Sequence, residues 1–156
     1  MFSIKINPRK DNQYPNINLL IVDNNQDHIY LLKTFLQDSG VDILATPYPQ
    51  NALQLCIDND ISIALVDVQM PEMDGFELLN LFKNHPLTKH IKVVLMSGYA
   101  TGPESVAKGL NMGAVDYLLK PLDLNETVAK VNSLVALANR LSEIDSKKNM
   151  VESYKE

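Results

Sequence analysis

The chain has 156 residues, of which 46% are hydrophobic and 21% are charged, and its formal net charge is −5. This length suits one globular domain with a substantial core, and the acidic balance argues against direct binding to nucleic acid, because a phosphate backbone is usually met with Lys and Arg. No apolar run approaches the roughly 18 residues of a membrane helix, and the N-terminus lacks the apolar stretch of a signal peptide. We therefore expect a cytoplasmic protein with no membrane contact.

Regular patterns begin after a polar N-terminal arm, residues 1–16. Five apolar runs typical of buried strands then alternate with segments of helical spacing. In chain order, we expect strands at Ile17–Val22, Val41–Ala45, Ile61–Val66, Ile91–Met96 and Ala114–Leu118, and helices at Gln26–Asp38, Gln50–Asn59, Gly75–Asn84, Pro103–Met112 and from near Asp123. Strands that are apolar on both faces and alternate with helices predict an α/β fold, with a five-stranded parallel sheet, doubly wound, and helices on both faces.

The last helix is expected to be unusually long, because no Gly or Pro occurs from Leu122 to Lys148. One apolar stripe can pack on the sheet and consists of Val128, Val131, Val135 and Ala138. A second stripe has the 3-4-3 spacing of a coiled-coil seam and consists of Leu134, Leu137, Leu141 and Ile144. We expect residues 139–156 to form a helical extension or linker, whose seam pairs with a second chain or continues into a downstream output domain.

Polar residues mark the ends of four predicted strands. Asp23 and Asn24 follow the first strand, Asp67 the third and Ser97 the fourth, and Lys120 lies just beyond the fifth. Because parallel strands end at one edge of a sheet, these side chains are expected to converge there. Carboxylates at such an edge suit a hard cation such as Mg²⁺, and one carboxylate with a free face can act as a nucleophile toward phosphorus. Each residue alone is more often a cap, turn or loop residue, so the hypothesis depends on their joint position.

Three motifs occur in a fixed order, LVDVQMPEMDGFELL, VVLMSGYA and GAVDYLLKPLD. They resemble the segments around the phosphorylation site of the receiver domain of two-component response regulators, of the chemotaxis-regulator type, and the resemblance covers residues 17–138. It implies a flavodoxin-like fold. It also implies a signalling role, in which a histidine kinase or phosphotransfer domain passes a phosphoryl group from phosphohistidine to this domain, with Mg²⁺ (or Mn²⁺ in its place) as cofactor. No enzymatic activity beyond the domain's own phosphorylation and dephosphorylation is implied.

The resemblance also implies roles for single residues. Asp67 matches the phosphoacceptor, and Lys120 and Ser97 match the groups that contact the phosphoryl oxygens. The metal ligands correspond to Asp23, Asn24, Asp67 and the backbone carbonyl of Gln69. Tyr117 matches an aromatic switch that turns inward on activation together with Ser97, and the Lys120–Pro121 bond matches a cis peptide. Gln69 and Tyr99 are bulky residues that flank the acceptor, so we expect slow loss of the phosphoryl group.

One residue departs from the family pattern. Asn24 stands where the family usually has a second acidic metal ligand. Removing a unit charge about 4 Å from a cation forfeits on the order of 4 kcal/mol of gross Coulomb energy at a surface-like dielectric, and desolvation returns part of it. We therefore expect weaker metal binding. The alternative is a pseudo-receiver that acts as a phosphorylation-independent interaction module.

Other interpretations have less support in the sequence. An aspartate-nucleophile phosphatase would carry an aspartate where Gln69 stands, and a flavin carrier would have a phosphate-binding loop in place of DNNQDH. The single cysteine, Cys56, excludes an internal disulfide and is expected to be a buried structural thiol. The three histidines, His28, His85 and His90, are too scattered to suggest a metal site or a phosphorelay motif.

Overall fold

The computed structural model describes residues 14–98 and 102–154. Its five strands are β1 (Ile17–Val22), β2 (Val41–Thr46), β3 (Ile63–Asp67), β4 (Lys92–Gly98) and β5 (Asp116–Lys120). Its helices are α1 (Gln26–Leu36), α2 (Ala52–Asn59, preceded by the 3-10 turn η1 at Pro49–Asn51), α3 (Gly75–Lys83), α4 (Gly102–Asn111) and α5 (Leu124–Tyr154). All neighbouring strands pair in parallel, in the order β2-β1-β3-β4-β5. This is the doubly wound, flavodoxin-like order, so the predicted fold class is confirmed.

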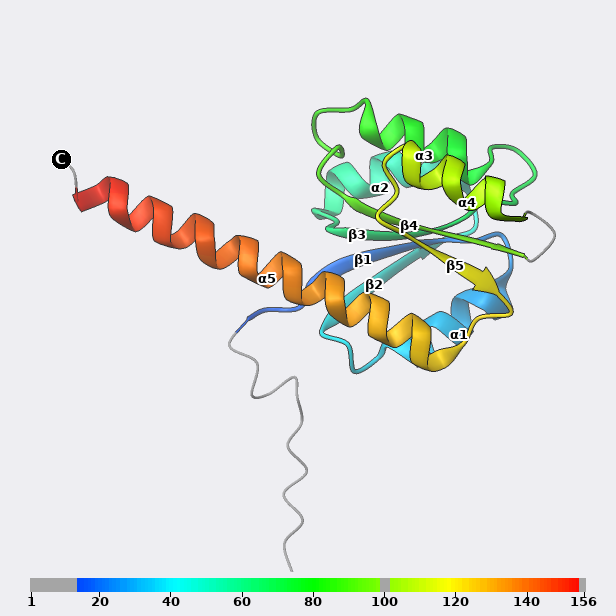
Figure 1. Cartoon of the computed structure of the whole chain (residues 1–156), viewed down its shortest axis with the longest axis horizontal. Helices are drawn as coiled ribbons and strands as arrows, with labels where there is room; N and C mark the ends of the chain where they lie inside the picture. The colour runs from blue at the N-terminus through cyan, green and yellow to red at the C-terminus, as the bar shows by residue number, and fades with distance from the viewer. Residues whose placement is uncertain (1–13, 99–101, 155–156) are drawn as a thin grey trace, which may run out of the picture.

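Helices cover both faces of the sheet, as Figure 1 shows, with α1 and α5 on one face and α2, α3 and α4 on the other. Side chains alternate between the two faces along each strand. In β1, for example, Leu19 and Ile21 join the core beneath α1 and α5, whereas Leu20 and Val22 join the core beneath the other three helices. Cys56 of α2 is buried in the second of these cores, and burial raises the pKa of its thiol to about 12, as suits a structural cysteine.

The later strands are shifted toward the C-terminus relative to the sequence prediction. The apolar residues Ile61, Ile91 and Ala114 are buried but precede β3, β4 and β5. At the other end, backbone pairing with neighbouring strands continues past the apolar run and includes polar residues. Asp67 and Lys120 are therefore the last residues of β3 and β5 and do not lie beyond them, and Ser97 lies within β4.

Helix α5 extends well past the sheet, as the sequence predicts, and projects from the rest of the domain in Figure 1. Val131 and Val135 are buried against the sheet. The second stripe is divided, because Leu134 is partly buried against the same core, whereas Leu137, Leu141 and Ile144 are 40%, 47% and 59% exposed. Within the part of the chain that the structure describes, no helix is long and apolar enough to cross a membrane.

Candidate functional site

The carboxyl edge of the sheet brings two aspartates together. Strand β1 leads directly into Asp23, and β3 ends at Asp67, and these two strands are neighbours in the sheet. Both carboxylates are buried, with Asp23 fully inaccessible. In each of them Oδ1 accepts a hydrogen bond from the backbone N–H two residues later, from Asn25 at 2.9 Å and from Gln69 at 3.0 Å. These turns fix both carboxyl groups and leave Oδ2 of each available to other groups.

A single lysine bridges the two carboxylates. The Nζ atom of Lys120 lies 3.2 Å from Oδ2 of Asp23 and 3.2 Å from Oδ2 of Asp67. The lysine side chain is only 17% exposed, so both ion pairs are poorly screened by solvent. The cluster therefore holds two carboxylates, which can bind a further cation, and one ammonium, which can stabilise a transferred anionic group.

A histidine completes the surroundings of the lysine. Nδ1 of His28 lies 3.1 Å from Lys120 Nζ and 3.3 Å from Asp23 Oδ2. The scattered positions of the three histidines along the chain do not predict this place for His28. The available signal was its place in the first turn of the helix that follows β1, since such a turn begins at the carboxyl edge of the sheet.

The pKa of Asp67 is raised above its ordinary value, mainly because burial removes the carboxylate from water. The negative charge of Asp23 raises it further, whereas the ammonium of Lys120 and the N–H of Gln69 lower it without cancelling the effect of burial. The ionised form of Asp67 is thus less favourable in the folded domain than in water, which leaves the carboxylate poorly solvated and available for a reaction partner.

The other predicted site residues lie around this cluster at different depths. Ser97 is fully buried in β4, one residue past the Met96 that pairs with Asp67. Asn24 and Gln69 are exposed, and Asn24 lines a hollow of about 330 Å³ together with Tyr48 and Glu72. Tyr99 lies outside the described residues.

The predicted switch residue is buried. The ring of Tyr117 is 6% exposed and belongs to the core beneath α3 and α4. Its hydroxyl is buried and has no hydrogen-bond partner among the residues that the structure describes. The Lys120–Pro121 peptide bond that follows this strand is cis.

Helix α3 packs closely on the backbone of Asp67. Asp74 caps this helix by accepting a hydrogen bond from the N–H of Glu77, and the N–H of Gly75 donates to the carbonyl of Val68. A Cβ atom added to Gly75 would lie 2.6 Å from the carbonyl oxygen of Asp67 and 2.9 Å from Cα of Val68. Only glycine fits at this position, which gives a packing reason for the glycine of the MDG motif.

The donor set at this edge fits Mg²⁺. Across residues 14–98 and 102–154, no three His, Cys, Asp or Glu side chains are grouped so that they could hold a metal ion. An ion here would therefore take the two carboxylates, neutral oxygens and water. This is the hard, water-rich coordination that Mg²⁺ accepts, since it usually retains several waters and binds through one or two carboxylates.

Comparison with known proteins identifies the family. A sequence profile of the response regulator receiver domain matches residues 19–132. The chain is 38% identical over 117 residues to the two-component response regulator ARR10 of Arabidopsis thaliana, covering 73% of this chain and 20% of that protein. It is 32% identical over 123 residues to the transcriptional regulatory protein ZraR of Escherichia coli, covering 79% of this chain and 27% of that protein. The chain thus spans about a quarter of the length of these curated relatives.

Solved structures agree with this result. A two-component response regulator from Clostridium difficile superposes with a TM-score of 0.71 at 28% identity, over 80% of this chain and 99% of that one. The receiver domain of the Francisella response regulator 1452 gives a TM-score of 0.71 at 27% identity, over 79% and 99% of the two chains. The fold, the order of the motifs and these matches together lead to one conclusion, which is that the chain belongs to the response regulator receiver domain family of two-component systems.

Proposed function

We propose that this chain receives a phosphoryl group on Asp67 from the phosphohistidine of a histidine kinase or phosphotransfer domain. The observation that carries the proposal is the contact of Lys120 Nζ with Oδ2 of both Asp23 and Asp67, at 3.2 Å each. Receiver domains are in general signalling modules that depend on phosphorylation and typically use Mg²⁺, and the proposal places that chemistry on named atoms of this chain.

In the proposed reaction, Asp67 Oδ2 attacks phosphorus while the bond from phosphorus to the donor imidazole nitrogen breaks, and that nitrogen takes a proton from water as the imidazole leaves. Oδ1 stays fixed by the N–H of Gln69, which orients the attacking oxygen. Lys120 moves its hydrogen bond from the carboxylate to a phosphoryl oxygen and neutralises part of its charge. A bound Mg²⁺, held by Asp23, Asp67, the Gln69 carbonyl and the neutral oxygen of Asn24, would supply further charge neutralisation.

Ser97 and Tyr117 are proposed to transmit the change. Both belong to the β4–β5 half of the sheet, and Ser97 is buried one residue past the strand partner of Asp67. A hydroxyl at that depth is placed to follow the phosphoryl group. Tyr117 is already inward and buried in this structure, and its hydroxyl has no partner among the described residues. The inward state expected on activation is therefore one that this side chain can adopt without a phosphoryl group, and we propose that phosphorylation shifts the balance toward it.

Treatment of the purified chain with acetyl phosphate and Mg²⁺, followed by intact-mass and peptide mass spectrometry, tests the proposal. We expect one phosphoryl group per chain on Asp67, and none in the Asp67→Asn variant. Asp74→Asn is the matched control, since it changes another aspartate seven residues later that caps α3. Undiminished labelling of Asp67→Asn would refute the assignment, and an unlabelled wild-type chain would favour the pseudo-receiver alternative that Asn24 suggests.

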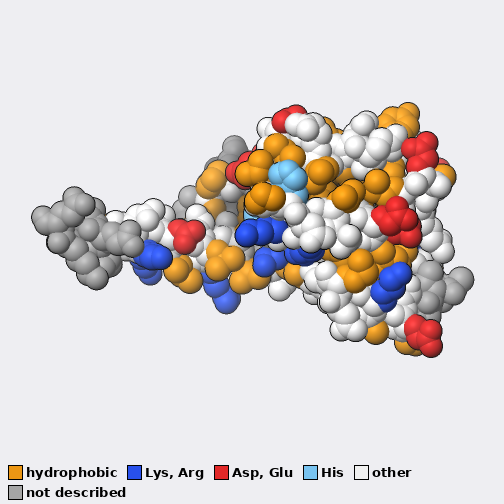
Figure 2. Space-filling model, turned by 90° about the horizontal axis from the view of Figure 1, so that it is seen from above, with side chains coloured by type: hydrophobic (Ala, Val, Ile, Leu, Met, Phe, Trp, Pro, Cys, Tyr) orange, Lys and Arg blue, Asp and Glu red, His pale blue; other side chains and the backbone are white. Residues whose placement is uncertain are grey.

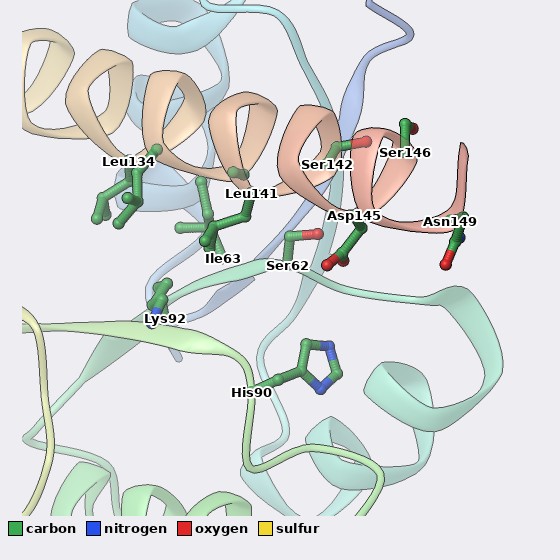
Figure 3. Close-up of a pocket in the computed structure, with 12 residues that line it drawn as sticks. Ser62, Ile63, His90, Lys92, Leu134, Leu141, Ser142, Asp145, Ser146 and Asn149 are labelled. Atoms are coloured by element: carbon green, nitrogen blue, oxygen red, sulfur yellow. The ribbon is translucent and has the colours of Figure 1, made fainter. Parts of the chain in front are cut away.

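We further propose that residues 17–138 are the receiver unit and that the rest of α5 joins it to a second chain. Figure 2 shows hydrophobic side chains between charged ones on the projecting part of this helix. Beside it lies a groove of about 550 Å³, between α5 and the amino ends of β3 and β4. Leu134 and Leu141 point from α5 toward Ile63 and Lys92 across this groove in Figure 3. A second helix laid along the seam would cover both the seam and the groove.

Charges beside the seam favour a parallel arrangement. With Leu134 and Leu141 at the first core position of successive heptads, Arg140 precedes the second heptad and Asp145 lies five residues later. In a parallel, in-register pair these two positions face each other between chains, so each Arg140 meets an Asp145. In an antiparallel pair, Arg140 would instead face the same heptad position of the other chain, where the positively charged Lys147 stands and would repel it.

Sedimentation of the intact chain tests this pairing. We expect a dimer for the wild type and a monomer for a Leu141→Glu, Ile144→Glu variant, because charge at two core positions of the seam opposes pairing. Leu81→Glu is the control, since Leu81 is 41% exposed and belongs to α3, which covers the opposite face of the sheet from α5. A monomeric wild type at high concentration would contradict self-association.

A further inference from the structure

His28 occupies a fixed place at the proposed phosphorylation site. Asn25 caps α1, with its Oδ1 atom accepting from the N–H groups of Asp27 at 2.9 Å and His28 at 3.3 Å. The cap holds the first turn against the end of β1, and from there the imidazole reaches the buried cluster. The side chain of His28 is 37% exposed, so one edge of the ring faces solvent while Nδ1 faces Asp23 and Lys120.

The contacts of the lysine ammonium account for all of its donors. A lysine ammonium has three N–H donors. Three acceptors lie close to Lys120 Nζ, with Oδ2 of Asp23 and Oδ2 of Asp67 at 3.2 Å and Nδ1 of His28 at 3.1 Å. Nδ1 acts as an acceptor here when the imidazole is neutral and carries its proton on Nε2. In that tautomer, His28 offers the lysine an acceptor without formal charge beside the two carboxylates.

We infer that His28 is a positioning residue for Lys120 in the phosphorylation reaction, an inference that rests on the proposed function. When Asp67 Oδ2 bonds to phosphorus, it loses its negative charge and its contact with Lys120 Nζ weakens. The ammonium then turns to a phosphoryl oxygen. The contacts to Asp23 and His28 persist through that movement and limit where Nζ can go. Without the imidazole, the third donor would bind mobile water, and the contact to Asp23 would be the one of the three that persists through the movement.

The test compares two substitutions of His28. His28→Ala removes the acceptor, whereas His28→Asn keeps one, since the amide oxygen of asparagine can lie near the position of Nδ1. His85→Ala is the control, because His85 lies in the loop after α3 and its ring accepts from a local backbone N–H, that of Leu87. The rate of autophosphorylation is measured against acetyl phosphate concentration with Mg²⁺, and the Lys120 ammonium signal is followed by NMR without phosphodonor.

For His28→Ala we expect the maximal rate to fall about fivefold, the size expected for one hydrogen bond, with the half-saturating donor concentration unchanged. The ammonium signal should broaden through exchange with water. His28→Asn should restore both the rate and the signal, and His85→Ala should match the wild type. A wild-type rate in His28→Ala, or an equal loss in His28→Asn and His28→Ala, would overturn the role of His28. An unlabelled wild type would instead overturn the proposed function itself, and the role with it.

Discussion

Replacing Lys120 by Met removes the positive charge of the cluster and keeps most of the length of the side chain. At 3.2 Å, each of its two ion pairs has a gross attraction of about 5 kcal/mol with an effective dielectric constant of 20. Desolvation offsets much of this attraction, but the substitution leaves two buried carboxylates facing each other without a cation. Loss of one partner from a buried pair typically costs about 3–5 kcal/mol, and we expect a loss of about 3 kcal/mol in the free energy of unfolding at pH 7.

Urea denaturation in the presence of a chelator measures this loss. Adding Asp67→Asn to Lys120→Met should restore a large part of the stability, because only one of the two facing groups then remains charged. Lys130→Met is the matched control, since Lys130 also contacts two carboxylates, of Asp116 at 3.1 Å and Glu126 at 3.0 Å, but does so at the surface. Its loss should cost under about 1 kcal/mol. Equal stability of Lys120→Met and the wild type would refute the view that the lysine holds the cluster together.

Three further predictions concern single side chains. Asp67→Asn should stabilise the unphosphorylated domain at pH 7 and lose this advantage in acid, because the pKa of Asp67 is raised in the folded state. Protonated Asp67 favours folding below its ordinary pKa of 3.8, and that contribution is lost as the pH rises through the folded-state pKa. The melting temperatures of the wild type and the variant should therefore diverge from pH 3 upward. A variant that is less stable than the wild type at pH 7 would contradict this reasoning. Asn24→Asp should tighten Mg²⁺ binding by at least tenfold, about 1.4 kcal/mol. Because Asn24 is exposed, the same substitution should lower the free energy of unfolding in chelator by under about 1 kcal/mol. Equal Mg²⁺ affinity of the two proteins in a titration would show that Asn24 does not face the metal. Tyr117→Phe should raise the free energy of unfolding by about 1 kcal/mol, since it removes a buried hydroxyl without a partner among the described residues, and a destabilised variant in urea melts would point to a role for that hydroxyl in the unphosphorylated state.

The sheet, and the meeting of polar residues at its carboxyl edge, could be predicted from the sequence, because both depend on the pattern of apolar runs along the chain. Apolar runs such as Leu19–Val22 show which segments are buried on both faces, and parallel pairing brings the ends of such segments to one edge. Asp23 and Asp67 therefore meet for reasons of topology. Strand ends were less predictable, because Lys120 belongs to β5 through backbone pairing, which hydrophobicity does not report.

The detailed contacts of the site could not be predicted, because they depend on side-chain directions. Nothing in the sequence says that one ammonium reaches Oδ2 of both aspartates, or that the His28 ring turns inward from the first turn of α1. The same holds for Leu134, which shares the spacing of Leu137 and Leu141 but lies partly against the core. A helical stripe gives the face on which a residue lies, whereas the point at which the helix leaves the domain decides which residues of that stripe are covered.

The contact between Gly75 and the backbone of Asp67 has a mechanical consequence. Since α3 begins directly against the Asp67 carbonyl with no space for a Cβ atom, the end of β3 and the start of α3 must move as one body. The backbone of Asp67 is then held in place by the helix that packs against it. We therefore expect a displacement that follows a change at its carboxylate to involve Lys120 and the strands β4 and β5, where buried Ser97 and Tyr117 lie.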